Sequence, residues 1–392
     1  MQPNKRPKIG LLELKSHHEV LRTYLLGFLA AEAEVHCFTN SFNAELNQDL
    51  IEQNHSNWYI QKAGQNQEQF LNSLKASFQE LDYLIITTYF SELPFYLFKK
   101  QKVGLLIHSW HFIVQPWYQM VRGSSSIALI NRWIKIPKTI IRRQKMLKQL
   151  SQATHLIAGA QSIVNYLNQQ SYKSTQSIRL LELYINEKIT PVRQNASELK
   201  IAIPGSIQKN SRDYDLLVEV FKQLAGTTDQ NIQLLFPTIA NNPTSKQIKE
   251  QLQPLAPKIQ TIFYEEYLDQ EQYDQLLLKA DFLFCPIQRY SYNGHVREVN
   301  GQSHLSANVN DMIRLGIPAV FPNFYILPPA IKSIVGTYST MNNCVALLRQ
   351  WISQKTYNEI KGEMSQHLQS YQREAVGKRF RQFLVDLQLY EQ

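Results

Sequence analysis

The chain lacks the features that mark secreted and membrane proteins. Only three cysteines occur among its 392 residues, at positions 37, 285 and 344, and no two have the spacing of a metal-binding or redox pair. Such cysteines are typical of small buried side chains in a reducing compartment. No run of about 18 uncharged apolar residues is present, so we expect neither a signal peptide nor a membrane span. These absences predict a cytoplasmic protein.

Acidic residues are missing from one long region of the sequence. From Leu93 to Leu181 there are thirteen lysines and arginines and no aspartate or glutamate. Residues 1–195 hold 22 Lys and Arg against 13 Asp and Glu, whereas the remainder is balanced. Such a positive field attracts anionic partners, such as a phosphate-bearing substrate or an acidic lipid surface. We do not expect nucleic acid as a partner, because no recognised binding motif accompanies the charge. A solvated basic face without a partner is the alternative.

The densest basic segment lies at residues 127–150. Pro137 is expected to split it, and the residues after Pro137 have the pattern of an amphipathic helix with a basic face. Such a helix either lies on an anionic membrane, near a lipid-linked acceptor, or packs on its own sheet with its basic side chains in water.

Short apolar runs alternate with helix-like segments along the whole chain, and 44% hydrophobic content suffices for two cores. The polar segment 186–200, which contains Pro191, is the expected linker between two halves. Repeated strand–helix units predict parallel sheets covered by helices on both faces, with a ligand cleft between the halves. The predicted strands are residues 9–14, 34–38, 83–87, 103–108, 155–158 and 178–183, and then 200–203, 233–236, 259–264, 282–285 and 319–321.

Residues 280–322 carry the strongest functional signal. A buried strand ends at Pro286, a polar loop follows, and a helix is predicted from about Ser306 to Leu315, stopped by Gly316. In open α/β sheets, phosphates and sugar hydroxyls are held where a strand ends before a helix. The polar side chains that we expect to bind a ligand here include Tyr290, His295 and Asn310. The alternative is an ordinary crossover with a solvated loop.

The helix of this segment reads D-M-I-R-L-G-I-P from Asp311 to Pro318. It resembles the E-A-M-A-x-G-x-P helix of GT-B-fold glycosyltransferases, in particular the large retaining group with two glutamates separated by seven residues. The second glutamate of that pattern falls on Asp311, which the resemblance implies would accept the donor ribose hydroxyls. The first, nearest the transferred sugar, falls on Ser303. One carboxylate is therefore shortened and the other is replaced by a hydroxyl.

A second part of the resemblance is the loop IAIPGSIQKNSRDYDLL, residues 201–217. In the family, a glycine there is followed by an Arg and a Lys that hold the donor diphosphate. This chain has Gly205, but Ser206 stands where the Arg would be, and Lys209 and Arg212 are candidates for the lost positive charge. A fixed cation stabilises the nucleoside diphosphate as it leaves. Alternatively, Arg212 is a solvated neighbour of a helix that begins at Asp213.

The resemblance implies an α/β protein of the GT-B fold, with two Rossmann-like domains whose parallel sheets face a central cleft. The expected domains are an acceptor-binding domain at 1–190 and a nucleotide-sugar domain at 191–365. A C-terminal helix at 366–392 would pack back on the first domain. No acidic pair lies at a predicted strand end where Mg²⁺ would bridge a diphosphate, so we expect neither a metal nor a cofactor.

Three histidines follow predicted strands of the first half: His18, His108 and His111. A histidine at the carboxyl end of a strand is a candidate proton acceptor or sugar-hydroxyl ligand, and the family resemblance implies the same. The H-x-x-H spacing of the last two is not expected to bind a metal, because it has no third ligand. Each of them is alternatively a loop residue satisfied by the backbone.

Together these observations predict an enzyme, a metal-independent glycosyltransferase. It would move a sugar from a nucleotide-diphosphate donor to a hydroxyl acceptor, a glycan or lipid-linked glycan of a surface polysaccharide or glycolipid. We expect it in the cytoplasm, either free or in peripheral contact with the inner face of an anionic membrane. The alternative function is a GT-B-like protein that has lost transfer and binds carbohydrate or nucleotide as the partner of another transferase. Ser303 in place of a glutamate favours this alternative.

Overall fold

A computed structural model describes residues 6–89, 93–114, 129–170, 172, 174, 176–187, 198–266, 268–293 and 296–390. The chain divides into two compact units. The first unit takes its described residues from 1–185, 293–298 and 373–392, and the second takes them from 186–292 and 299–372. Each unit therefore contains segments that are far apart in the sequence.

The described part of the first unit contains a parallel sheet of seven strands in the order β3-β2-β1-β4-β5-β6-β7. Its central strands are short apolar runs, as expected for strands of a parallel sheet that is covered on both faces. In β4, for example, every residue is buried. The chain runs outward in both directions from the neighbours β1 and β4, so their carboxyl ends lie where such sheets bind ligands. The strands are β1 (Lys8–Glu13), β2 (Glu34–Asn40), β3 (Asn57–Gln61), β4 (Tyr83–Ile86), β5 (Lys102–Leu106), β6 (His155–Ala158) and β7 (Ser177–Leu180).

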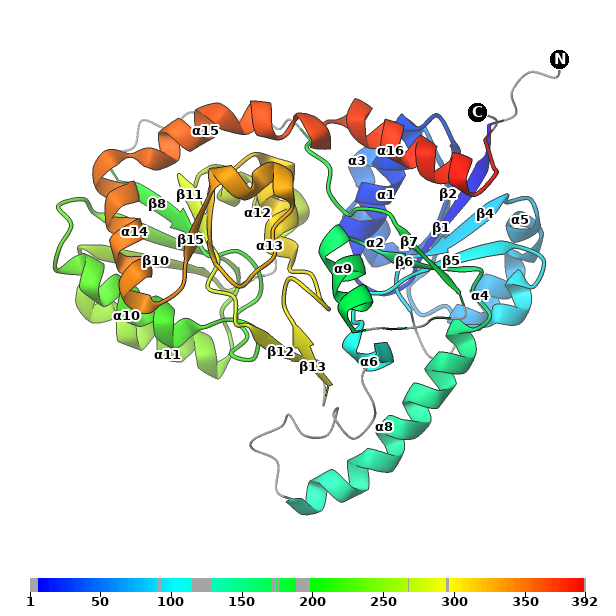
Figure 1. Cartoon of the computed structure of the whole chain (residues 1–392), viewed down its shortest axis with the longest axis horizontal. Coiled ribbons are helices and arrows are strands. Elements are labelled where there is room, and N and C mark those ends of the chain that lie inside the picture. The colour runs from blue at the N-terminus through cyan, green and yellow to red at the C-terminus, as the bar shows by residue number, and fades with distance from the viewer. Residues whose placement is uncertain are drawn as a thin grey trace. The chain divides into compact units, whose positions relative to one another are not determined.

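The helices of the first unit include the last helix of the chain, α16 (Arg373–Asp386), which packs along α1 (His18–Ala30) (Figure 1). The Phe28 and Phe380 rings meet edge to face at 4.8 Å. Gly27 allows this approach, because a Cβ atom there would lie 2.5 Å from the Phe380 ring. The other helices are α2 (Ser41–Glu45), α3 (Gln48–Glu52), α4 (Gln67–Ser73), α5 (Lys75–Gln79), η1 (Phe95–Phe98), α6 (His111–Val114), α8 (Leu129–Leu150) and α9 (Gln161–Gln169).

The described part of the second unit contains a parallel sheet of six strands in the order β10-β9-β8-β11-β14-β15. Its outward-running neighbours are β8 and β11, whose carboxyl ends again form the expected ligand edge. The strands are β8 (Leu199–Ala202), β9 (Ile232–Ile239), β10 (Ile259–Tyr264), β11 (Phe282–Phe284), β14 (Ala319–Pro322) and β15 (Val335–Tyr338). A separate two-stranded sheet is formed by β12 (Tyr290–Asn293) and β13 (Val296–Val299), and its residues 293–298 are counted with the first unit.

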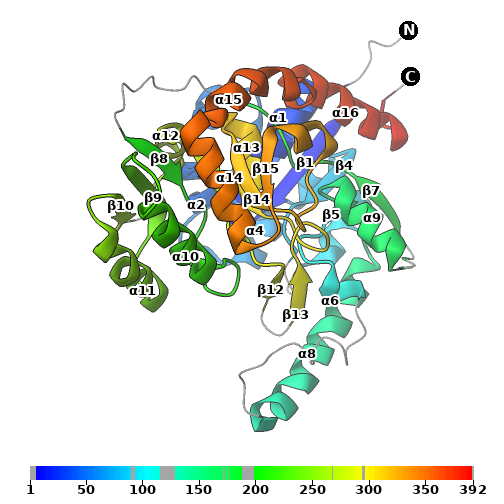
Figure 2. The ribbon, with the colours of Figure 1, turned by 60° about the vertical axis from the view of Figure 1, so that its left-hand side comes forward.

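Helices of the second unit enclose its apolar core, with α10 (Tyr214–Ala225) and α14 (Met341–Gln354) packed side by side (Figure 2). Helix α13 (Ala307–Leu315) begins after the cap Ser306 and ends at Gly316, whose φ of 65° suits a residue without a side chain. The remaining helices are α11 (Pro243–Leu252), η2 (Gln253–Leu255), α12 (Gln270–Leu278), η3 (Pro329–Ile334), α15 (Thr356–His367) and η4 (Gln369–Tyr371).

Three sequence-based interpretations of the fold are corrected by the structure. Pro137 lies within the single 22-residue helix α8 and does not split it, because a proline removes one backbone donor without forcing a long helix to end. The pattern of residues 68–80 predicts one helix, but the structure has two short helices there, α4 and α5. The polar loop after β11 contains the strands β12 and β13. Within the described parts of the chain, no helix is both long and apolar enough to cross a membrane.

Candidate functional site

The first candidate region is the carboxyl edge of the second sheet, where Gly205 and Arg212 follow β8. Gly205 has a φ of 87°, and a Cβ atom there would lie 2.1 Å from Arg212 Nη2. Both the backbone conformation and the space therefore require glycine. The Arg212 side chain is buried, and its Nε and Nη2 groups donate to the Pro204 carbonyl at 3.2 and 2.8 Å. A guanidinium is thus fixed across the loop that follows the first strand of this unit.

Arg212 is also tied to the start of α13. Its Nη2 donates to Asn308 Oδ1 at 2.9 Å, and Asn308 Nδ2 donates to the Pro204 carbonyl at 3.0 Å. Arg212 Nη1 has no hydrogen-bond partner among the described residues. The first turn of α13 contains no acidic residue. A fixed cation beside a helix N-terminus favours an anion such as a phosphate group.

Asp311 lies one turn into α13 and is buried. Its Oδ2 accepts a hydrogen bond of 2.9 Å from the Tyr273 hydroxyl, which α12 supplies. Arg314 Nη2 lies 3.8 Å from Asp311 Oδ1, and Arg314 also forms two hydrogen bonds of 2.5 Å with Asp274. The carboxylate of Asp311 is therefore held from two sides at the edge that carries Arg212.

The other predicted ligands of the second unit have varied settings. Ser303 is fully buried, and its Oγ accepts a 2.8 Å hydrogen bond from the Val299 backbone N–H. This bond places the side chain in a local turn. Ser206, Lys209 and Tyr290 are exposed, whereas Asn310 is half-buried. His295 lies outside the described residues, and its predicted role stays a prediction.

The sequence contains one Asp-x-Asp run, Asp213-Tyr214-Asp215. It lies at the start of a helix and not at the end of a strand. Asp213 is the N-cap of α10 and accepts a 3.0 Å hydrogen bond from the Leu216 backbone N–H. Its carboxylate is therefore used in capping the helix. Among the described residues, no group of three or more His, Cys, Asp or Glu side chains is arranged to hold a metal ion.

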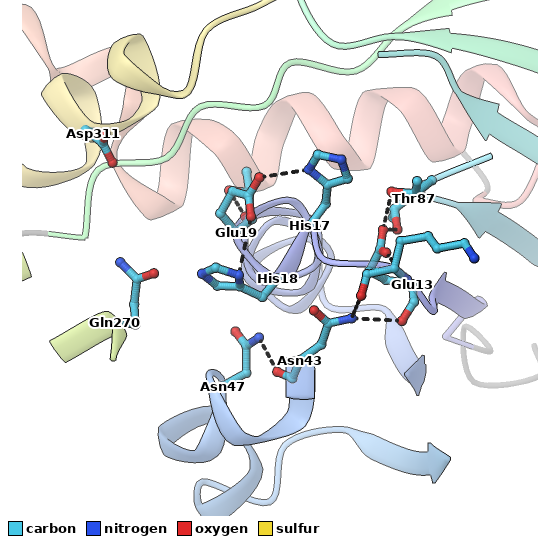
Figure 3. A network of polar contacts seen from close by, with 12 residues as sticks. Glu13, His17, His18, Glu19, Asn43, Asn47, Thr87, Gln270 and Asp311 are labelled. Carbon is cyan, nitrogen blue, oxygen red and sulfur yellow. Dashed lines mark hydrogen bonds and ion pairs between the residues drawn. The ribbon is translucent and has the colours of Figure 1, made fainter. Parts of the chain in front are cut away.

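The second candidate region is the carboxyl edge of the first sheet, where Glu13 ends β1. Glu13 is fully buried, and its carboxylate accepts hydrogen bonds from the hydroxyls of Thr87 at 2.6 Å and Thr88 at 2.5 Å and from the Lys15 backbone N–H at 2.6 Å. These bonds join the loop after β1 to the loop after β4. Asn43 donates to the carbonyls of Glu13 and Lys15, which fixes the first of these loops further (Figure 3).

His17 lies on this fixed loop and was not selected from the sequence. Its Nδ1 lies 3.1 Å from Glu19 Oε1 (Figure 3), and its ring stacks on that of His108 at 4.5 Å with an interplanar angle of 14°. Burial opposes the charged form, but the hydrogen bond and charge of Glu19, with Glu13 beyond, raise the pKa of His17 above 6.5. Burial raises the pKa of Glu19, but the hydrogen bond and charge of His17, with the charge of His18 and a backbone hydrogen bond, together lower it below 4.5. The two groups therefore form an ion pair.

The three histidines chosen from the sequence lie in different settings. His108 is half-buried beside His17, and its Nε2–H donates to the Thr87 carbonyl at 2.7 Å. His18 is half-buried, with Nδ1 3.5 Å from Glu19 Oε2. His111 is buried; its ring nitrogens contact the Arg297 carbonyl and the Tyr166 hydroxyl, and burial lowers its pKa. The geometry thus brings His108 together with His17 and favours a structural role for His111.

Comparison with known proteins identifies the fold. The pneumococcal O-GlcNAc transferase GtfA, solved with UDP and GlcNAc, superposes with a TM-score of 0.61 at 9% identity over 98% of this chain and 99% of GtfA. A glycosyltransferase from Rickettsia africae ESF-5 gives 0.59 at 12% identity over 98% and 99% of the two chains. The fold is GT-B. The predicted pair of parallel-sheet α/β domains is therefore confirmed.

The GT-B fold is not restricted to transferases. A protein from Listeria monocytogenes assigned as a UDP-N-acetylglucosamine 2-epimerase is similar with a TM-score of 0.53 at 11% identity, over 96% of this chain and 95% of the other. No family model matches the chain, and no curated protein matches it. Similarity at these identities shows the fold and not the activity.

Proposed function

We propose that the protein is a glycosyltransferase that takes its sugar from a nucleotide-diphosphate donor held by the second unit. The GT-B fold supports this proposal, and GtfA of the same fold was solved with UDP and GlcNAc. Gly205, Arg212 and the start of α13 would hold the diphosphate, and Asp311 would accept the ribose hydroxyls. Ser206 and Lys209 lie on the same loop, and Ser303, Asn310, Tyr290 and His295 follow β11, so these residues are further candidate donor ligands.

Arg212 is the observation that carries the proposal. Its guanidinium is buried, donates to the Pro204 carbonyl and to Asn308 Oδ1, and lies beside a helix N-terminus. It is therefore pre-organised for a doubly charged leaving group. As the glycosidic bond breaks, negative charge grows on the departing diphosphate, and a fixed cation stabilises that charge without a bound metal. We therefore also propose that transfer is independent of metal ions and of any cofactor.

Calorimetry with UDP, GDP and dTDP tests the donor site. Arg212→Ala is expected to weaken the nucleotide that binds by about 1.5–3 kcal/mol, the usual contribution of a hydrogen bond to a charged group. Arg349→Ala, which removes an exposed arginine from α14 of the same unit, is the matched control and should bind as the wild type does. Unchanged affinity in Arg212→Ala would remove the phosphate role of this side chain.

We propose that the acceptor is a hydroxyl of a glycan or lipid-linked glycan and that the first unit binds it. His108 is the preferred contact to the reacting hydroxyl, with His18 and His111 as the other candidates from the sequence. His108→Ala is expected to lower turnover strongly while donor affinity is unchanged.

Product analysis with UDP-, GDP- and dTDP-sugars separates transfer from epimerisation, since an epimerase returns an altered nucleotide sugar without an acceptor.

A GT-B-like binding partner of another transferase is the second candidate function. The observation that favours it is the turn at Ser303, whose hydroxyl is bonded to the Val299 backbone where the resembled family carries a glutamate. Such a protein would bind a nucleotide or a glycan but would neither transfer nor hydrolyse any donor sugar. Binding in calorimetry without turnover of any nucleotide sugar would favour this function over transfer.

A further inference from the structure

Helices α12 and α13 are joined by two adjacent polar contacts. Tyr273 and Asp274 are neighbours on α12, and they contact Asp311 and Arg314, which are one turn apart on α13. Asp274, Asp311 and Arg314 are all buried. The network therefore holds two carboxylates and one guanidinium away from water.

Stability alone does not account for this network. Removing charges from water is expensive, and well-packed apolar side chains in place of a buried ion pair are often neutral or stabilising. Arg314 is engaged by both oxygens of Asp274 and also lies 3.8 Å from Asp311 Oδ1, so one guanidinium faces two carboxylates. The carboxylate oxygens of Asp311 lie at the carboxyl edge of the sheet and suit hydroxyl donors rather than phosphate.

Tyr273 is the group that sets the direction of this carboxylate. Its hydroxyl donates to Asp311 Oδ2 at 2.9 Å. Burial, together with the charge of Asp311, raises the pKa of Tyr273 well above 10.0, so the hydroxyl keeps its proton and remains a donor. A carboxylate accepts several hydrogen bonds, so one oxygen held by Tyr273 still leaves capacity for a ligand.

We propose that Tyr273 is a positioning residue that orients Asp311 toward the vicinal hydroxyls of a nucleotide ribose and so makes the donor site selective for ribose over 2′-deoxyribose. This inference rests on the proposed function, because it takes Asp311 as the ribose ligand. Asp274 supports the arrangement by holding Arg314 beside Asp311.

Calorimetry with UDP, GDP and ADP, and then with the 2′-deoxy form of whichever binds, tests the proposal. The wild type should prefer the ribose form, and Tyr273→Phe should reduce that preference by about five- to tenfold, which lies within the usual net contribution of one hydrogen bond. Affinity for the 2′-deoxy form should stay unchanged. Tyr357→Phe is the matched control, because Tyr357 is a buried tyrosine of the same unit that packs on Phe282.

A double-mutant cycle separates positioning from a general effect on folding. In an Asp311→Asn background, Tyr273→Phe should change the ribose preference no further, because it acts through Asp311. An equal loss for ribose and 2′-deoxyribose forms, or an unchanged ratio, would overturn the positioning role and leave the donor proposal standing. Failure of the wild type to bind any of the three nucleotides would overturn the positioning role, and failure to bind dTDP as well would overturn the donor proposal.

Discussion

At the scale of single residues, the His17–Glu19 pair makes the stability of the first unit depend on pH. The pKa of His17 is raised, so its contribution is complete below about 6.5 and is lost as pH rises through the folded-state value. The pKa of Glu19 is lowered, so its contribution is complete above about 4.5 and is lost as pH falls through the folded-state value. The pair therefore stabilises the fold most between these two values.

Denaturant unfolding from pH 4.5 to 9 of the wild type and His17→Gln measures this contribution. The difference in the free energy of unfolding should be largest near pH 5–6 and should shrink toward pH 9. His55→Gln, which removes an exposed histidine from the same unit, should show no such pH dependence. A difference that is constant across the range would mean that His17 acts by packing against His108 and not through its charge.

The sequence predicted some site residues and could not predict others. Gly205 and Arg212 lie within eight positions on one loop, so their proximity follows from local sequence alone. The sequence does not single out His17, because its partner His108 follows a different strand, 91 residues later, and the two rings stack only after β1 and β5 share a sheet. Tyr273 was missed for the same reason, since only the packing of α12 against α13 places it on Asp311.

At the scale of elements, the packing of α16 on α1 contributes a large part of the first core. Phe380 is almost fully buried and contacts Tyr24, Phe28 and Gly27. Phe380→Ala should lower the free energy of unfolding by about 3–5 kcal/mol, the usual loss for a buried phenylalanine. Phe42→Ala, at an exposed aromatic of the same unit, should change it by less than about 0.5 kcal/mol. Chemical denaturation measures both, and equal effects would contradict the packing role.

Helix α8 is the element for which we propose contact with an anionic membrane. Lys145 and Lys148 are exposed on it, whereas Arg143 Nη2 donates to the Ile113 carbonyl at 2.9 Å and is better left in place. The variant Lys145→Gln/Lys148→Gln should weaken binding to phosphatidylserine vesicles by about 1 kcal/mol per lysine. Binding should also fall steeply with salt, because exposed charges are screened within about 8 Å at physiological ionic strength.

A matched control for the vesicle experiment is Lys222→Gln/Lys246→Gln, which removes two exposed lysines from the second unit. It should bind vesicles as the wild type does, and both variants should keep the donor affinity of the wild type. If the wild-type protein ignores anionic vesicles at low salt, the membrane proposal is wrong and a water-soluble acceptor is the better choice.

The elements that the sequence predicted are those with the strongest apolar pattern. The buried strand β4, for example, is a run of four apolar residues. The edge strand β3 was missed, because its residues are only partly buried and its pattern is weak. The sequence does not predict β12 and β13, because each strand has only four residues and they lie in a segment rich in polar residues, which is typical of loops.

At the scale of the whole molecule, the metal-independent chemistry that we propose has a direct test. Turnover of a nucleotide sugar should persist in excess EDTA, because Arg212 would supply the positive charge that a metal otherwise provides. If turnover is lost in EDTA and is restored by Mn²⁺ or Mg²⁺, this proposal is wrong. Such a result would leave the GT-B fold unaffected, since the fold follows from the sheets and their comparisons.

The return of the chain to its first unit has a consequence for biosynthesis. The face of α1 that carries Tyr24 and Phe28 is covered by Phe380 and Phe383 of α16. A ribosome therefore has to translate more than 370 residues before this face can be covered. Until then the aromatic face of α1 in the nascent first unit is exposed, and exposed apolar surface of this kind is bound by chaperones and is prone to aggregation. Release of a chain that stops before Arg373 should accordingly yield aggregates or rapid turnover in the cell.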